Sequence, residues 1–551
     1  MSASQLPSAF RHPYSFATPF KKSVAYFSME FAIDQALKTY SGGLGFLAGS
    51  HMRSAFDERQ NLIGIGILWK YGYYDQTRQA DNSMGVHFRE KIYGFLQDTG
   101  VRFSITVSGR PVWVQVYFLD PKHFNTVPMF FLTTDVDGND TAARSISYRL
   151  YDADATLKVS QCMLLGLGGA KFLDEINYSP EVYHLNEAHA VSAAFHLYKT
   201  LGSRKAVQAR MVFTTHTPEE AGNDKHDIGF LNGLGFFGEL SLDTVRETTG
   251  IRDSVFNHSL AALRLSRKAN GVSKLHGEVS RAMWGNYPDI CEITHVTNAQ
   301  NHRYWADSQL ESARQSGDTE TIAVRKKALK EPLFAIVADQ VGKLFDPKIL
   351  TMVWARRFAA YKRPDLLTQD AERFRRLMNN RDYPLQFIWA GKPYPMDEGA
   401  TRTFNYLYYL SHLHPRMAVL TGHELALSKA LKDGADLWLN TPIVPREASG
   451  TSGMAAAMNA AVNVSTNDGW ICEFEKPSGS NQNSFIVPDS PGGNPDAHDR
   501  THLFRLLEED VMPMYYDRPA DWQALQLRSM NDVNAYFTSA RMVREYYEKV
   551  Y

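Results

Sequence analysis

The sequence predicts an α/β protein made of two Rossmann-like lobes that face each other across a cleft. Three observations predict this fold class. At 551 residues the chain is too long for one ordinary domain. Short apolar runs alternate with helical stretches in both halves, which is typical of parallel sheets with right-handed crossovers. The apolar runs also lack polar alternation, as strands buried on both faces do.

The first half carries this strand pattern together with one expected antiparallel insertion. The insertion is a hairpin of Phe103–Val107 and Val112–Phe118, with a turn at Ser108-Gly109. The runs expected to be buried strands are Val24–Phe27, Leu62–Trp69, Val182–Leu185 and Met211–Thr214.

The second half repeats the pattern after a polar stretch at residues 301–308. We therefore expect residues 1–298 to form the N-terminal lobe and residues 299–530 to form the C-terminal lobe. Residues 531–551 are expected to form a terminal helix that packs back on the first lobe. Ligands of such parallel sheets bind at the carboxyl ends of the strands. The expected strands are Glu292–Val296 before the boundary and Leu350–Ala355, Leu385–Ala390, Met417–Leu420, Asp436–Leu439 and Val462–Val464 after it.

Composition and charge exclude several classes of function. The net charge is −1 and there is no basic domain, so nucleic acid is not an expected partner. No apolar run approaches the ~20 residues that span a bilayer, and the N-terminus lacks the apolar region of a signal peptide. Cys162, Cys291 and Cys472 are far apart and have no C-x-x-C spacing, which fits a reducing compartment. We expect a cytoplasmic protein without a membrane partner.

A glycine-rich turn in the first half forms the first candidate phosphate site. Ser41-Gly42-Gly43-Leu44-Gly45 precedes a helical stretch at Phe46–Phe56. Glycines let the backbone approach a ligand closely, and a helix N-terminus supplies free amides and a positive dipole. The pattern suits a phosphate group, although a plain tight turn has the same sequence features.

Two segments that follow second-half strands carry groups suited to phosphate and sugar. The run R-R-F-A-A-Y-K-R, residues 356–363, brings four cations to the end of an expected strand, where they fit phosphate oxygens. In Pro445–Met458 the carboxylate of Glu447 precedes a Gly/Ser/Thr turn, so it can accept hydrogen bonds from sugar hydroxyls while turn amides hold phosphate. A solvated charge run and a capped helix are the alternatives. We expect Asp468-Gly469-Trp470 near the cleft as well.

Two first-half segments add polar side chains at expected strand ends. They are H-L-N-E-A-H, residues 184–189, and T-T-H-T-P, residues 214–218. Their histidines, with Asn and Glu beside them, fit hydrogen bonding to a polyol, although a single such histidine is more often structural. No third ligand or i, i+4 pair accompanies them, so no zinc site is expected. Asp135–Asp140 resembles a calcium loop, but Asp140 stands where that loop needs glycine, and a turn is the simpler interpretation.

Seven segments, taken together, resemble the α-glucan (glycogen/maltodextrin) phosphorylase family. The resemblance follows the family's order over nearly the whole chain and matches its shorter bacterial and archaeal members. The segments are Y-S-G-G-L-G, H-L-N-E-A-H-A, F-T-T-H-T-P, N-G-V-S-K-L-H-G-E-V-S, R-R-F-A-A-Y-K-R, W-L-N-T-P…E-A-S-G-T-S-G-M and R-M-V-R-E-Y.

The resemblance implies a GT-B fold with an inter-domain active-site cleft. It also implies transfer of glucose between an α-1,4-glucan and phosphate, with the anomeric configuration retained. The implied cofactor is pyridoxal phosphate, whose phosphate group exchanges a proton with substrate phosphate. The family is commonly dimeric, so a homodimer is implied too.

The resemblance also assigns roles to individual residues. By motif position the catalytic residues are Arg357, Lys362, His216 and Glu447. The substrate-binding residues are Gly42, Gly43, Glu187, His189, Asn298, Ser449 and Gly450, with Trp305 in the same sugar-side motif as Asn298. The residues that hold the cofactor phosphate are Arg356 and Thr451.

One position departs from the family pattern. In the family, the motif continues to a lysine that forms the Schiff base with pyridoxal phosphate, and here Ala455 occupies that position. An alanine methyl group cannot form an imine, so covalent attachment of the cofactor is not expected. The nearest lysines in sequence, Lys429, Lys432 and Lys476, match no family anchor.

Three functions therefore stay open. The first is a phosphorylase-like enzyme without a covalently held cofactor. The second is a retaining glycosyltransferase that uses a sugar nucleotide, since the same cations would suit a diphosphate. The third is a non-catalytic glucan-binding homologue. Because buried cations without an anion are costly, we expect a phosphate-bearing ligand in the site in addition to a glucan or oligosaccharide.

Overall fold

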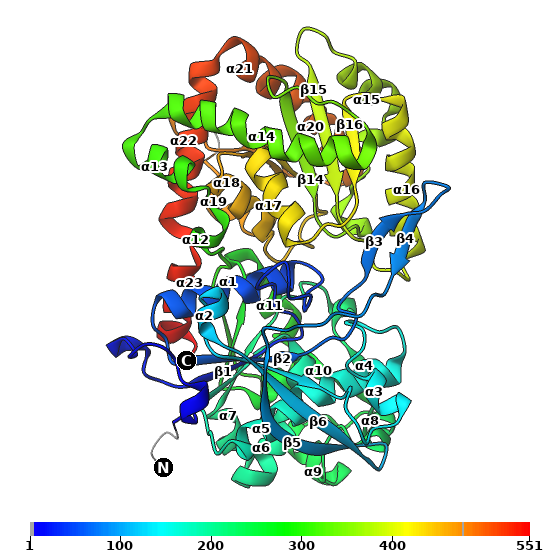
Figure 1. Ribbon diagram of the computed structural model, residues 1–551, viewed down its shortest axis with the longest axis vertical. Helices are drawn as coiled ribbons and strands as arrows, with labels where there is room; N and C mark the ends of the chain where they lie inside the picture. Colours follow the sequence, from blue (N-terminus) through cyan, green and yellow to red (C-terminus); the bar gives the residue numbers. More distant parts are fainter. Residues whose placement is uncertain (1–4, 477–478) are drawn as a thin grey trace. The chain divides into compact units, whose positions relative to one another are not determined.

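The computed structural model describes residues 5–476 and 479–551. Within that range the chain divides into two compact units (Figure 1). Of the described residues, unit 1 holds 5–74, 88–298 and 539–551, and unit 2 holds 75–87, 299–476 and 479–538. The structure thus places the segment 75–87 in the unit that is otherwise built from the second half of the sequence. Residues 531–538 also lie in unit 2.

Unit 1 is built on a large sheet whose strand order is β13-β12-β9-β8-β1-β2-β7-β6-β5. The strands from β13 to β7 are parallel, which confirms the expected parallel α/β sheet. From β1 the chain adds β2 and β7 on one side of the sheet and later adds β8, β9, β12 and β13 on the other side, so the strand order reverses between β1 and β8. The bounds are β1 Val24–Phe27, β2 Leu62–Ile67, β5 Gln97–Val107, β6 Arg110–Leu119, β7 Met129–Thr133, β8 Val182–Asn186, β9 Met211–Thr214, β12 Lys268–Gly271 and β13 Glu292–His295.

The expected hairpin is present as β5 and β6, which pair antiparallel and continue the sheet through β7. A short pair, β10 (Lys225–Asp227) and β11 (Val255–Asn257), lies outside the main sheet. The helices of unit 1 are α1 Gly43–Asp57, α2 Pro121–Phe124, α3 Thr141–Ser145, α4 Ala155–Met163, α5 Gly169–Glu175, α6 Ala193–Leu201, α7 Arg204–Gln208, α8 Ile228–Leu234, α9 Leu242–Thr249, α10 His258–Leu265, α11 Lys274–Trp284 and α23 Ser539–Lys549.

The C-terminal segment differs from the single terminal helix expected for residues 531–551. Helix α22 (Pro519–Tyr536) ends in unit 2, and α23 begins at Ser539 in unit 1. The red helix α23 packs beside the blue helix α1 (Figure 1), where the hydroxyl groups of Ser54 and Ser539 are 2.5 Å apart. The two ends of the chain therefore share unit 1.

Unit 2 contains a fully parallel sheet with the strand order β16-β15-β14-β17-β18-β19. In chain order this is 3-2-1-4-5-6, the order of dinucleotide-binding Rossmann sheets. Strands β14 and β15 are buried at every position because helices cover both faces. The bounds are β14 Leu350–Ala355, β15 Leu385–Ala390, β16 Met417–Leu420, β17 Leu437–Asn440, β18 Val462–Thr466 and β19 Phe485–Val487.

A core of apolar side chains joins this sheet to its helices. Leu333 and Val337 of α14 pack with Val353, Trp438 and Ala456. The helices of unit 2 are α12 His302–Trp305, α13 Ser308–Ser316, α14 Thr319–Val341, α15 Ala371–Met378, α16 Glu398–Leu413, α17 Leu425–Gly434, α18 Thr451–Met458, α19 Ile471–Phe474, α20 Pro495–Arg505, α21 Met512–Asp517 and α22.

A hairpin from the first half of the sequence completes unit 2. Strands β3 (Asp75–Arg78) and β4 (Met84–His87) pair antiparallel and pack against α16 (Figure 1). Gln76 donates to the carbonyl of Gly391 at 3.0 Å and accepts from the amide of Gly422 at 3.1 Å. The hairpin therefore bonds to the loops that follow β15 and β16.

Candidate active site

The predicted phosphate-binding residues of unit 2 follow two neighbouring strands. The cationic run begins at Arg356, directly after β14, and the segment with Glu447 follows β17. Strands β14 and β17 pair in parallel at the point where the strand order of the sheet reverses. Ligands of open α/β sheets bind at the carboxyl ends of the strands beside such a reversal. The fold thus brings the two segments together where a ligand is expected.

Glu447 is the centre of the unit 2 site. Its carboxylate lies 2.6 Å from Nζ of Lys362 and 3.2 Å from Nη2 of Arg356. Its side chain is 11% exposed. Burial alone would raise the pKa of Glu447, but Arg356, Lys362 and Arg357 together lower it to about 2. Glu447 is therefore an anion at every physiological pH.

Arg356 has hydrogen-bonding capacity that its pairing with Glu447 leaves unused. Its Nε and Nη1 atoms are buried and have no hydrogen-bond partner among the described residues. The hydroxyl oxygen of Ser449 is also buried and has no hydrogen-bond partner among the described residues. Unpaired buried donors of this kind cost free energy unless a ligand meets them. Arg357, by contrast, is exposed.

The turn before α18 supplies backbone groups beside this cluster. Gly450 has φ +93°, a left-handed conformation that favours glycine, and it precedes the first helical residue, Thr451. A Cβ at Gly450 would approach the Trp470 ring to 3.1 Å. Ala455 lies on α18 and is fully buried. Its carbonyl accepts from Nδ2 of Asn459 at 2.9 Å, and its methyl group carries no reactive atom.

Asp468 is a second carboxyl group at the same site. Its Oδ2 accepts the backbone amide of Glu447 at 2.8 Å. Burial is the largest cause that raises the pKa of Asp468, to about 7, and the charge of Glu447 adds to it. Sequence alone predicts that this segment lies near the cleft, but not that it holds Glu447 in position.

Glu187 organises the unit 1 site at the end of β8. It has φ +68°, and its Oε1 accepts from the His216 amide at 2.5 Å and the Thr217 hydroxyl at 3.0 Å. Burial raises the pKa of Glu187 to about 7 although these hydrogen bonds lower it. The unit 1 site therefore contains a carboxyl group that titrates near neutral pH.

His216 is held as a neutral imidazole. Its Nε2 lies 2.7 Å from Oδ1 of Asn186, so Nε2 carries the proton and donates to the amide oxygen. Burial is the main cause that lowers the pKa of His216 to about 3. A neutral His216 with a fixed tautomer is suited to hydrogen bonding rather than to carrying charge.

The glycine-rich turn meets a carboxylate that the motif does not reveal. Glu30, which follows β1, accepts from the backbone amides of Ser41 at 2.6 Å and Gly42 at 3.0 Å. The Gly42 amide is thus engaged within the protein, whereas Gly43 is exposed. The phosphate role of this turn stays a prediction for Gly42 and Gly43.

His189 and Asn298 are the other predicted residues of unit 1. The His189 ring centroid lies 6.1 Å from that of Tyr151, whose hydroxyl donates to Glu30 at 2.6 Å. Asn298 follows β13 and is buried. Its partner in the sequence motif, Trp305, belongs to unit 2. Nδ1 of His189 and Oδ1 of Asn298 have no hydrogen-bond partner among the described residues.

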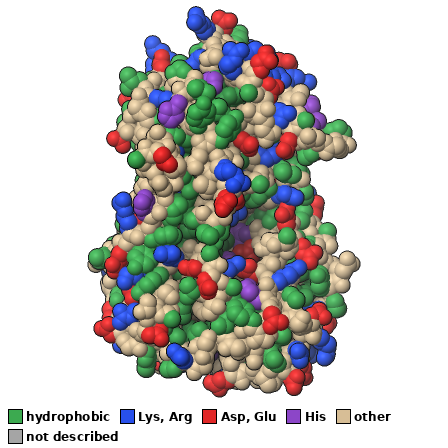
Figure 2. Space-filling view, turned by 90° about the vertical axis from the view of Figure 1, so that its right-hand side faces the viewer, with side chains coloured by type: hydrophobic (Ala, Val, Ile, Leu, Met, Phe, Trp, Pro, Cys, Tyr) green, Lys and Arg blue, Asp and Glu red, His purple; other side chains and the backbone are tan. Residues whose placement is uncertain are grey.

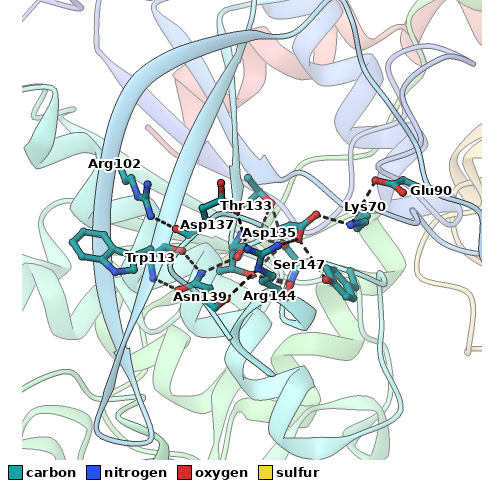
Figure 3. A network of polar contacts seen from close by, with 12 residues as sticks. Lys70, Glu90, Arg102, Trp113, Thr133, Asp135, Asp137, Asn139, Arg144 and Ser147 are labelled. Carbon is teal, nitrogen blue, oxygen red and sulfur yellow. Dashed lines mark hydrogen bonds and ion pairs between the residues drawn. The ribbon is translucent and has the colours of Figure 1, made fainter. Parts of the chain in front are cut away.

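The carboxylates of the aspartate-rich turn at residues 135–140 form ion pairs with lysine and arginine side chains of the protein (Figure 3). Asp135 accepts from Lys70 at 2.8 Å, and Asp137 accepts from Arg144 at 3.0 Å. Asn139 donates to the carbonyl of Trp113 at 2.8 Å. The turn is therefore a structural element that ties the β6 edge to the loop after β7. In residues 5–476 and 479–551, no group of three or more His, Cys, Asp or Glu side chains is arranged to hold a metal ion.

Charged side chains of both signs lie on the face of the molecule that Figure 2 presents. Figure 2 shows acidic and basic side chains interspersed over the face that it presents, which agrees with the net charge of −1. None of the helices in the described part of the chain is long and apolar enough to cross a membrane.

Comparisons with known proteins place this chain among carbohydrate phosphorylases. A family model described as carbohydrate phosphorylase matches residues 307–488. A maltodextrin phosphorylase of Thermococcus litoralis is 31% identical over 98% of this chain and 73% of its own length. A glycogen phosphorylase of Mycobacterium tuberculosis is 30% identical over 96% of this chain and 70% of its own length. An uncharacterised protein of Methanocaldococcus jannaschii is 43% identical over 96% of this chain and its own full length.

Proposed function

Because this chain belongs to the α-glucan phosphorylase family, we propose that it transfers glucosyl units between an α-1,4-glucan and phosphate with retention of configuration. We also propose that its two Rossmann-like units form a GT-B fold. The observation that carries the proposal is the cluster of Arg356, Lys362 and Glu447 at the strand reversal of unit 2. The two cations can bind phosphate oxygens, and the buried carboxylate can accept hydrogen bonds from sugar hydroxyls.

In this proposal the cations of unit 2 hold the phosphate that attacks or leaves. Nε and Nη1 of Arg356 are available donors, and Arg357 and Lys362 add positive charge. Donors fixed before the reaction stabilise charge that develops on phosphate oxygens in the transition state. Glu447, Ser449 and Gly450 bind glucosyl hydroxyls, and the anionic state of Glu447 makes it an acceptor.

The residues of unit 1 contact the sugar in this proposal. His216 approaches the donor sugar, and its fixed neutral ring offers Nδ1 as an acceptor. Glu187, His189 and Asn298 line the sugar site, where the unpartnered atoms of His189 and Asn298 are suited to hydroxyl groups. Gly43, with Gly42, faces a phosphate group.

Pyridoxal phosphate, when bound, would supply a phosphate group that exchanges a proton with the substrate phosphate. The residues present fit its phosphate end, because Arg356 has unused buried donors and Thr451 begins a helix with free amides. They do not fit an imine at residue 455, where a buried methyl group stands. We therefore propose that the transfer proceeds without a cofactor anchored at Ala455.

A sugar-nucleotide-dependent retaining transferase is the second candidate. One observation favours it: the phosphate-binding cluster is intact while the residue at 455 carries no amine. The same cations would then stabilise a leaving diphosphate. A non-catalytic glucan-binding role is the third candidate.

The decisive experiment measures glucose 1-phosphate from maltooligosaccharide and inorganic phosphate, with and without added pyridoxal phosphate. Product from the native chain, lost in Arg356→Met and kept in the surface variant Arg376→Met, supports the proposal. Product only from Ala455→Lys means that the site is intact and only the anchor is lost. No product from the native chain or from Ala455→Lys contradicts the proposal, and sugar nucleotides are then tested as donors.

A further inference from the structure

The last cation of the cationic run after β14 points into the protein. Arg363 is 3% exposed, and each of its guanidinium nitrogens donates to a group of unit 2. Nε donates to the carbonyl of Thr441 at 2.8 Å, and Nη2 donates to the carbonyl of Pro442 at 2.9 Å. Nη1 lies 2.9 Å from Oδ1 of Asp496, and Nη2 lies 2.6 Å from Oδ2 of Asp499. The guanidinium is thus taken up by the protein and is not offered to a ligand.

These bonds, which we call the Arg363 clamp, join three parts of unit 2. Arg363 stands in the segment after β14, its two carbonyl partners directly follow β17, and its two aspartates lie on α20. The Thr441 hydroxyl lies 3.0 Å from the carbonyl oxygen of Lys362 and 3.2 Å from that of Arg363. The Ile443 amide donates to the Tyr361 carbonyl at 2.8 Å. Residues 361–363 are therefore bonded along their length to the loop after β17.

The backbone at Arg363 has a conformation that needs such support. Its φ of +47° and ψ of 59° lie in the left-handed region, where the Cβ of any residue other than glycine is crowded. Such a conformation persists where the surrounding structure holds it in several ways, and it is frequent at functional sites. Because Lys362 is the preceding residue, the conformation at Arg363 helps to set the path of the segment that carries the Lys362 amine.

We propose that Arg363 is a positioning residue, whose clamp holds the Lys362 segment against the loop after β17. Held in this way, Nζ of Lys362 stands 2.6 Å from the carboxylate of Glu447, which comes from that same loop. Arg363 itself touches neither phosphate nor sugar. The inference rests on the proposed function, because that proposal assigns phosphate binding to Lys362.

Arginine is suited to this role in a way that lysine is not. The guanidinium is planar and presents its N–H groups in a fixed fork, and here it meets two carbonyls and two carboxylates. Lysine keeps the positive charge, but its single nitrogen cannot reach acceptors spread over a loop and a helix. Arg363→Lys therefore changes the geometry of the clamp and leaves the charge beside the site nearly the same.

Two rival explanations give Arg363 a different role. As a direct phosphate ligand, it would act through its own charge, which Arg363→Lys retains. As a purely structural ion pair, it would contribute to stability and leave the Lys362 amine in place when it is replaced. The three explanations differ in what happens to Lys362, so the tests follow that residue.

The first test measures affinity for inorganic phosphate by calorimetry in the native chain, Arg363→Lys and Arg373→Lys. We expect Arg363→Lys to bind phosphate at least about tenfold more weakly, which is the worth of one charge-assisted hydrogen bond. Arg373→Lys is the matched control, because Arg373 also forms a forked ion pair, with Glu508 elsewhere in unit 2, and it should keep the native affinity. Native affinity in Arg363→Lys overturns the proposal.

A double variant separates positioning of Lys362 from a direct contact with phosphate. In Lys362→Met the amine that the clamp positions is absent, so adding Arg363→Lys should not weaken phosphate binding further. A second loss as large as the first, which a direct contact or a general loosening of the site would cause, overturns the proposal.

A third measurement needs no ligand and follows the Lys362 amine itself. The native chain and Arg363→Lys are treated with an amine-acetylating reagent, and each lysine is read by peptide mass spectrometry. Lys362 is shielded in its pair with Glu447, and we expect its acetylation to be at least about tenfold faster in Arg363→Lys, since local protection falls when the contacts that hold a segment are lost. Lys330, which is 1% exposed and paired with Asp436, is the internal control and should stay slow.

The internal control also shows whether a variant is folded. Fast acetylation of both lysines means that Arg363→Lys is unfolded, and Asp499→Asn, which removes one carboxylate of the clamp and keeps Arg363, is then judged by the same criterion. Unchanged protection of Lys362 in a folded variant overturns the proposal. Absence of phosphate binding by the native chain contradicts the proposed function alone, because the acetylation of Lys362 still decides whether Arg363 positions it.

Discussion

The carboxylate of Glu447 lies 2.6 Å from Nζ of Lys362. The two residues are 85 positions apart in the sequence and follow two strands that are neighbours only in the folded sheet. Removing one partner of such a pair leaves a buried charge uncompensated. The pair is therefore costly if its only role is to stabilise the fold. Its position at the strand reversal fits the proposed role in binding charged and hydroxylated ligands.

We predict that Glu447→Gln separates phosphate binding from glucosyl transfer. Loss of the carboxylate leaves Arg356 and Lys362 unneutralised, so inorganic phosphate should bind roughly tenfold more tightly by calorimetry. Transfer should fall about 100-fold or more, because an oriented charged acceptor is lost. Glu508→Gln, which breaks an ion pair with Arg373 elsewhere in unit 2, is the control and should change neither quantity. Weaker phosphate binding in Glu447→Gln would contradict the electrostatic account of the site.

We predict that Asp468→Asn stabilises the protein more at pH 8 than at pH 5. The native carboxyl has a pKa of about 7, raised from 3.8. Between those values the folded state holds a proton that the unfolded chain releases, so the contribution of Asp468 to stability falls as pH rises. Asparagine does not titrate and keeps an oxygen acceptor for the Glu447 amide. Thermal unfolding of both proteins at the two pH values checks this, and an equal difference at both would rule it out.

The main strands could be predicted from sequence because buried parallel strands are continuous apolar runs. Residues 24–27, 211–214, 350–355 and 385–390 were assigned in this way, and the structure has strands with the same bounds. The hairpin β3–β4 was missed because Asp75–Arg78 is polar and only partly buried. Strand β12 was missed because Lys268–Gly271 has almost no apolar side chain.

Candidate site residues could be named from sequence where a motif places several charged groups after one strand, as at Arg356–Lys362. Glu30 was missed because its contact with Gly42 depends on how two loops pack. One signal was available, since Glu30 closely follows a predicted strand.

We predict that Arg78→Ala loosens the hairpin β3–β4 from unit 2. The Arg78 guanidinium lies 3.3 Å from the ring centroid of Tyr408 and donates to the carbonyl of Val419 at 2.9 Å. Loss of the stacking and the hydrogen bond should lower the free energy of unfolding by about 1–3 kcal/mol. Limited proteolysis within residues 75–87 should become faster. Arg402→Ala on the exposed face of α16 is the control, and cleavage that is equally slow in Arg78→Ala would refute the prediction.

We predict that Gly391→Ala impairs phosphate binding by moving Arg356. Gly391 follows β15 with φ +151°, and a Cβ there would stand 1.8 Å from the backbone carbonyl oxygen of Arg356. Backbone atoms cannot yield as a flexible side chain does, so the loop after β14 must shift. We expect a loss of about 1–3 kcal/mol in stability and a weaker affinity for inorganic phosphate.

Gly342→Ala is the control for Gly391→Ala, because it introduces backbone strain without displacing the loop that carries Arg356. Gly342 ends α14 with φ +67°, but a Cβ there meets nothing within 4 Å. This control should lose stability through backbone strain and keep its phosphate affinity. If Gly391→Ala loses stability but binds phosphate as the native chain does, then Arg356 does not depend on the β15 loop for its position. A parallel loss of both quantities in Gly391→Ala alone would mean that close packing of the two loops holds the guanidinium in place.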